Sequence, residues 1–246
     1  MVPKICFGTN TYEPIVNAEQ RSTSQCQANA AAYEDIHNLI KMGRIHPFVP
    51  ESIFTFELYN NDQRAAIIKN YTPKVSSEIL SQDDKSLKIT MTIEPNPKNS
   101  PSFSNNCYSK KNFQAAIDAG FKVLRRPARY MGYQNFDLHE KVFAPNSISE
   151  KEEQERMCEH ALHWIERMWG CGKASADKMP QKKVFAELAD SDALASCYGY
   201  DIHYFCTNDE GRSAGAGSIL HVSHRKKIKE KLNIDIISPQ ELINML

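Results

Sequence analysis

The chain of 246 residues has no excess of charge, because 30 lysines and arginines balance 30 aspartates and glutamates. Overall charge therefore does not indicate a nucleic-acid partner, and such a partner would have to bind a local basic patch. The sequence also has no charged leader and no apolar run of about 18 residues, the length that a membrane-spanning helix needs. We therefore expect a soluble, cytoplasmic protein with no membrane partner.

The seven cysteines are odd in number and have no compact repeating spacing. A disulfide scaffold is not expected in a chain of this size. Cys6, Cys197 and Cys206 lie in apolar contexts and are predicted to be small buried residues. Reduced thiols are therefore expected. The sequence also lacks internal repeats.

Apolar periodicity predicts alternating strands and helices in the first and last thirds of the chain. Strands are expected at 4–8 and 46–50, and helices over 25–42, with a stop at Gly43, and over about 50–70. Beyond residue 180, the expected elements are a helix over 181–198, a strand over 202–208, a basic helix over 222–232, the strand IDIIS and a short helix from Pro239. This alternation is typical of a mainly parallel sheet with helices on both faces.

The middle of the chain follows a different pattern. Residues 73–109 hold one alternating strand, SLKITMTIEP, and a loop rich in Pro, Asn and Ser. A helix over 110–119 ends at Gly120, and a charged helix covers 149–169. That charged helix is expected to pack on the core through one apolar stripe, formed by Met157, Ala161, Trp164, Ile165 and Met168. The segment 73–180 is predicted to be an insertion between the two halves of a single domain, 1–246.

Polar side chains follow two of the predicted strands. In α/β sheets, functional groups gather at the carboxyl ends of the strands, so Gly8-Thr9-Asn10 and Thr207-Asn208-Asp209 are the first candidates. Asp192 lies seventeen residues before Asp209 and is expected to point from the head of a helix toward the same edge. Glu57 lies in the apolar stretch IFTFEL, where a buried acid is costly unless something pairs with it. Three converging carboxylates would repel one another, and Mg²⁺ or Mn²⁺ would relieve that repulsion.

The order of these residues resembles the PIN domain, a family of metal-dependent ribonucleases that includes the toxins of many toxin–antitoxin pairs. The chain matches the family pattern at Thr9-Asn10, at Glu57, at Asp192 in DSDALA and at Asp209 in FCTND. The ending IDIISPQEL is also similar to the family's last strand and helix. The resemblance covers roughly 1–70 and 185–246. It implies an α/β, PIN-like three-layer fold with a mainly parallel sheet flanked by helices, plus a mixed insertion.

The resemblance also implies a function. In a metal-dependent endoribonuclease of this type, Glu57, Asp192 and Asp209 would hold Mg²⁺ or Mn²⁺, Asn10 would support the metal, and the metal would activate water. RNA is the implied substrate, in the setting of a toxin–antitoxin or defence system. An antitoxin or regulatory protein and a homo-oligomer are left open as partners. The alternative function is a non-catalytic RNA- or protein-binding module on a degenerate nuclease fold.

Gly8 departs from the family pattern, which has an aspartate as a direct metal ligand at this position. Glycine has no side chain to offer, so the remaining acids should hold metal poorly and the activity of this chain should be absent or attenuated. Two explanations stay open: a naturally degenerate site, and an inactivating replacement. The survival of the other acids favours the second explanation.

Simpler explanations exist for two of the acids. Asp209 could cap the turn Asn-Asp-Glu-Gly, and Asp192 could be a helix N-cap without a further role. Each explanation accounts for one residue and leaves Glu57 unexplained. The ordered set as a whole therefore favours a common site.

Four further groups of residues carry chemistry that a site could use. Cys158, His160, His163 and Cys171 do not have a common zinc spacing, so a place on a helix surface is preferred. The glycine-rich EGRSAGAGS lacks the Gly-Lys-Ser/Thr ending of a P-loop and is expected to flank the active site. HRKKIKEK, at 224–231, is expected to be a solvated helix face. The candidate RNA contact is an arginine cluster next to two tyrosines, made of Arg125, Arg126 and Arg129.

Overall fold

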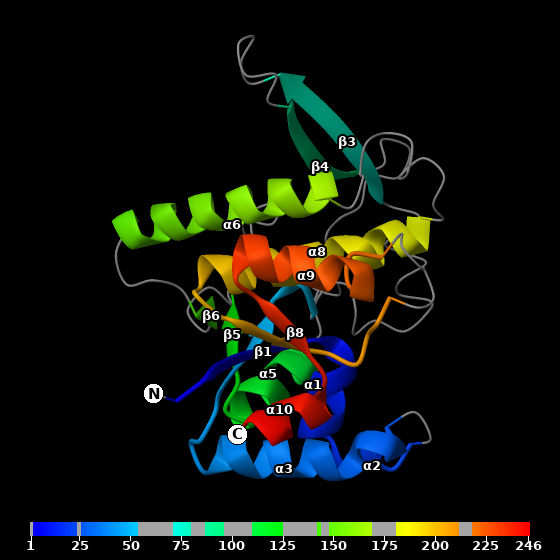
Figure 1. The fold of residues 1–246 in the computed structure, drawn as a ribbon, viewed down its shortest axis with the longest axis vertical. Coiled ribbons are helices and arrows are strands. Elements are labelled where there is room, and N and C mark those ends of the chain that lie inside the picture. The colour runs from blue at the N-terminus through cyan, green and yellow to red at the C-terminus, as the bar shows by residue number, and fades with distance from the viewer. Residues whose placement is uncertain are drawn as a thin grey trace.

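A sheet of six parallel strands forms the centre of the fold (Figure 1), in the order β6-β5-β2-β1-β7-β8. Its strands are β1 (Lys4–Phe7), β2 (His46–Pro50), β5 (Lys122–Leu124), β6 (Val142–Phe143), β7 (Tyr204–Cys206) and β8 (Asp235–Ile237). The structure is a computed structural model that describes residues 2–23, 26–53, 71–79, 87–95, 110–124, 142–143, 148–168, 181–211 and 218–246.

The central strands are buried on both faces, as the sequence of a parallel sheet requires. Successive side chains of a strand point to opposite faces. In β1, Ile5 and Phe7 therefore join the core on one face of the sheet, and Cys6 joins the core on the other. Cys6 lies opposite Phe48 of β2 and Phe205 of β7, and all three belong to the same core. The short apolar runs therefore supply both cores at once.

One face of the sheet is covered by α1 (Thr9–Val16), α3 (Ala30–Lys41), α5 (Lys110–Asp118) and α10 (Pro239–Met245). The short α2 (Ala18–Arg21) and the 3₁₀ turn η1 (Gln27–Asn29) connect α1 to α3. Aromatic rings fill the space under β1. The ring of Phe121 packs edge-to-face on Phe7 and Tyr12, with centroids 5.6 and 5.3 Å away.

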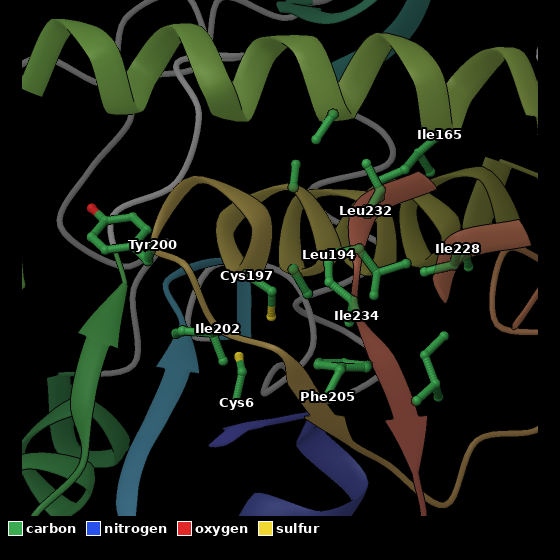
Figure 2. Packing of buried hydrophobic residues seen from close by; sticks show 14 of the residues in the cluster. Cys6, Ile165, Leu194, Cys197, Tyr200, Ile202, Phe205, Ile228, Leu232 and Ile234 are labelled. Atoms are coloured by element: carbon green, nitrogen blue, oxygen red, sulfur yellow. The ribbon is translucent and has the colours of Figure 1, made fainter. Parts of the chain in front are cut away.

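The other face is covered by α8 (Gln181–Gly199) and α9 (Val222–Leu232), and α6 (Ile148–Met168) lies outside α8 (Figure 1). Because α8 is enclosed by the sheet and by α6, residues 191–197 are all buried. Figure 2 shows Cys197 of α8 pointing toward Cys6 of β1, with Phe205 close by. In α6, Ala161 and Ile165 are fully buried in the same core.

The predicted fold class is confirmed: the chain is α/β, with helices in layers on both faces of a parallel sheet. The predicted helix stops are also in place. Gly43 has a φ of +67°, and the Arg44 N–H donates to the carbonyl of Leu39, which ends α3. Gly120 likewise has a φ of +85° after α5. The closing helix α10 begins with a capping box between Ser238 and Glu241.

The structure contains elements that the sequence did not predict. Helix α1 was not predicted, because Pro14 lies inside it. The polar strand β3 (Tyr71–Ile79) was also not predicted; it pairs antiparallel with β4 (Leu87–Pro95) in a separate two-stranded sheet. The short strands β5 and β6 extend the main sheet from within 73–180. The insertion stays a prediction, and residues 54–70 of the expected second helix lie outside the described residues.

The five cysteines in the described residues are free thiols, as expected: Cys6, Cys26, Cys158, Cys197 and Cys206. Burial, together with the neighbouring Cys197, raises the pKa of Cys6 well above its ordinary value. Cys107 and Cys171 lie outside the described part of the chain. In that part, no helix is long and apolar enough to span a bilayer.

Gly199 allows α6 and α8 to pack closely, and a substitution at this position tests that packing. A Cβ atom at Gly199 would lie 2.2 Å from the Sγ of Cys158 and 3.2 Å from the carbonyl oxygen of Gln154. Gly199→Ala should therefore lower the free energy of unfolding by about 1–3 kcal/mol, measured by urea denaturation. Cys158→Ala removes the nearer atom, so the double variant should lose less than the sum of the two single variants. Equal or higher stability of Gly199→Ala would contradict this packing.

Candidate functional site at the carboxyl edge of the sheet

The carboxyl ends of β1 and β7 are joined beyond the last residue of each strand. The Gly8 N–H donates to the carbonyl of Cys206 at 3.0 Å, which continues the β1–β7 ladder. The hydroxyl of Thr11 lies 2.8 Å from the carbonyl oxygens of both Gly8 and Cys206. On the other side of β7, the Thr207 N–H donates to the carbonyl of Ile237. The backbone at this edge is therefore held by hydrogen bonds to the end of β1, to α1 and to β8.

Asn10 bridges the segments that follow β1 and β7. Its side-chain Oδ1 accepts hydrogen bonds from the Thr207 hydroxyl at 3.1 Å and from the Asn208 N–H at 3.2 Å. Asn10 and Asn208 thus lie together at the carboxyl edge, where the sequence placed them. The role of Asn10 in supporting a metal stays a prediction.

Tyr33 of α3 also belongs to this polar network. Its hydroxyl accepts a hydrogen bond from the Asn208 side-chain amide, and it lies 3.5 Å from the carbonyl oxygen of Asn10. That carbonyl needs another donor because Pro14, four residues later, has no N–H. Burial raises the pKa of Tyr33 to about 12, so the phenol stays protonated and able to donate at neutral pH.

The space around Gly8 is narrow. Its backbone is ordinary extended chain, with φ −75° and ψ 164°, so the dihedral angles do not require glycine. A Cβ atom at this position, however, would lie 3.2 Å from the Oγ1 of Thr207 and 3.3 Å from the ring of Phe205. Both neighbours are almost fully buried, at 3% and 1% exposure, and have little freedom to move. Glycine is therefore favoured here by space.

Asp209 lies at the carboxyl edge and is exposed. Its carboxylate Oδ1 accepts the Gly211 N–H at 2.7 Å, and its own N–H donates to the Oγ1 of Thr207. The turn-capping explanation therefore describes one oxygen of this side chain. A carboxylate has two oxygens and several lone pairs, so turn capping does not exclude a metal ligand.

Asp192 is fully buried in the interior of α8, eleven residues after the helix begins. It is therefore not a helix N-cap, and it does not lie at the head of this helix. Asp192 shares a helix face with Gly199, seven residues later, and that face packs on Cys158 of α6. Burial, then the nearby Cys197 and Asp192, raise the pKa of Cys158 to about 12. Asp192 thus lies at the α6–α8 interface, and its metal role stays a prediction.

Two other acids of α8 lie closer to the carboxyl edge, and the sequence analysis missed them. Asp190 shares a face with Cys197, which points at the sheet, and it is rotated by about 200° from Asp192. The chain turns back after α8 to form β7, so α8 runs antiparallel to the strands and its early residues lie toward their carboxyl ends. Asp190 precedes Cys197 by seven residues and therefore lies about 10 Å further in that direction. The carboxylate of Glu187 accepts the Ile219 N–H at 2.7 Å, which anchors the loop after β7 to this end of α8. Their signal in the sequence is the presence of three acids, at positions 187, 190 and 192, in the short stretch FAELADSDAL.

The remaining predicted site residues lie outside the described part of the chain. They are Glu57, Arg125, Arg126 and Arg129, together with Cys171 of the zinc alternative. Within the described ranges, no group of three or more His, Cys, Asp and Glu side chains is arranged to hold a metal ion. The described oxygen donors at the edge, Asp209 and Asn10, are of the type that Mg²⁺ and Mn²⁺ take, but they are not a full ligand set.

Comparisons with protein-family models, with curated proteins and with solved structures found no match to this chain.

The Tyr33 network can be tested with a pair of tyrosine variants. Tyr33→Phe removes the acceptor of the Asn208 amide, so the free energy of unfolding should fall by about 1–2 kcal/mol in urea denaturation. Tyr204→Phe is the control, because the Tyr204 hydroxyl makes no hydrogen bond to any described residue. Equal stability of the two variants would show that the network contributes nothing to the edge.

Proposed function

We propose that this chain is a metal-dependent endoribonuclease of PIN type whose activity is attenuated by Gly8. The observation that carries the proposal is the bridge made by Asn10 between the ends of β1 and β7, with the exposed carboxylate of Asp209 beside it. Functional groups of open α/β sheets gather at such an edge. The setting, a toxin–antitoxin or defence system, is proposed from the family resemblance alone.

A divalent cation at this edge would activate a water molecule for attack on a phosphodiester. The residues that would hold it are Asp209 and Glu57, with either Asp192 or the better-placed Asp190 as the third acid. In this chain, the hydrogen-bonded Asn10 and Thr207 keep the two strand ends at a fixed separation. The backbone N–H groups of Gly8, Thr207 and Asn208 are already hydrogen-bonded before a substrate binds.

A second candidate function is a non-catalytic RNA-binding module. The crowding at Gly8 favours it, because a residue with a side chain has little room between Thr207 and Phe205. In such a protein the edge would bind the substrate class of a nuclease without cutting it. The two candidates share a ligand and differ in chemistry.

The substitution Gly8→Asp separates the two candidates. In the nuclease, restoring the acid should produce Mg²⁺- or Mn²⁺-dependent cleavage of single-stranded RNA, followed by gel electrophoresis, and adding Asp209→Ala should abolish it. Gly8→Ala is the matched control, since it adds the same Cβ without a carboxylate. Both variants should lose about 1–3 kcal/mol of stability because of the crowding.

The outcomes of this experiment are distinct. A folded Gly8→Asp variant without cleavage would favour the binding module. If the unsubstituted protein cut RNA as fast as Gly8→Asp, position 8 would not be a ligand position. The double variant, purified in the same way, controls for contaminating nucleases.

A further inference from the structure

Helix α9 carries five basic side chains and one acidic side chain in a protein without net charge. Its apolar Ile228 and Leu232 are buried against the sheet. The opposite face is exposed and holds Lys226, Lys227, Lys229 and Lys231. This face is therefore a local basic surface, which the zero net charge of the whole chain did not indicate.

The acids near α9 neutralise only part of this charge. Lys229 pairs with Asp235 of β8, and Lys226 lies 3.8 Å from Glu230 with both side chains largely exposed. Exposed pairs of this kind are weak. Lys227 and Lys231 make no ion pair with a described residue. They are one helical turn apart, so their ammonium groups form a short row on the exposed face.

The first turn of α9 is bound directly to the candidate site. The Arg225 guanidinium donates from Nη2 to the carbonyl of Asp209 at 2.9 Å and from Nε to the carbonyl of Leu220 at 3.4 Å. The amino end of α9 therefore lies at the carboxyl edge of the sheet, next to the proposed catalytic residues. The helix dipole adds positive potential at that end.

We propose that the exposed face of α9 is the surface along which a single strand of RNA lies as it enters the carboxyl edge. The inference rests on the proposed function and adds the path of the substrate, with Lys227 and Lys231 bound to phosphates. A row of lysines fits a chain of phosphates, since each ammonium is a mobile point charge. An interface with a protein would need apolar or aromatic anchors, and Val222 is the one large apolar side chain exposed on α9.

The test is a charge-neutralising double variant, Lys227→Gln with Lys231→Gln. Binding of a fluorescent single-stranded RNA to the full chain is followed by anisotropy, without divalent metal and at several salt concentrations. Affinity should fall roughly tenfold, and the slope of log K against log salt should become shallower by about 1.4, or about 0.7 for each lost phosphate contact. The control is Lys4→Gln with Lys41→Gln, which removes the same charge from exposed lysines of β1 and α3.

Failure of this inference can be distinguished from failure of the proposed function. If the unsubstituted protein binds RNA and both double variants bind equally well, the path along α9 is overturned while RNA binding stands. If the unsubstituted protein binds no RNA, both proposals fail. If it binds polyglutamate instead, and the α9 variant abolishes that binding, the surface serves an acidic protein. Thermal unfolding of both variants checks that the fold is intact.

Discussion

The pairing of β1 with β7 is the contact on which the rest of the structure depends. Both strands have a neighbouring strand on each side, and their ladder is continued by the Gly8 N–H and by the Thr11 hydroxyl, which bonds to the Cys206 carbonyl. Because Gly8 has no side chain, the backbone at this position lies close to the Oγ1 of Thr207. The same approach brings Asn10 within reach of Thr207 and Asn208. The geometry of the candidate site is thus a consequence of how two buried strands end.

The enclosure of α8 divides its acids into two groups with different environments. Residues 191–197 of α8 are buried between the sheet and α6, so a polar side chain in this stretch meets one neighbour or the other. Asp192 turns toward α6 and Cys158, whereas Asp190 and Glu187 lie toward the sheet and the loop after β7. Any metal chemistry at the edge would therefore depend on which acid of this helix is used.

The sequence predicted the fold better than it predicted the site. Apolar runs such as Ile5-Cys6-Phe7, and helix stops such as Gly43, are local signals, and the elements they predict are in place. Helix α1 was missed because its proline is tolerated through a tertiary contact, the Tyr33 hydroxyl near the carbonyl of Asn10. The sequence also did not predict which neighbour the Asp192 side of α8 packs against, for a related reason. Spacing along a helix shows which residues share a face, but only the packing of α6 shows what that face meets.

The packing around Gly8 sets what an acid at this position would cost. A Cβ atom there would lie 3.2 Å from the Oγ1 of Thr207 and 3.3 Å from the ring of Phe205, and both neighbours are buried. Interiors are packed closely, so these neighbours resist a larger residue and would have to shift by a few tenths of an ångström to admit the Cβ atom of an aspartate. The acid that would complete the proposed metal site therefore competes with the close approach of the strand ends that positions Asn10. Stability and cleavage are expected to change in opposite directions in the Gly8→Asp variant.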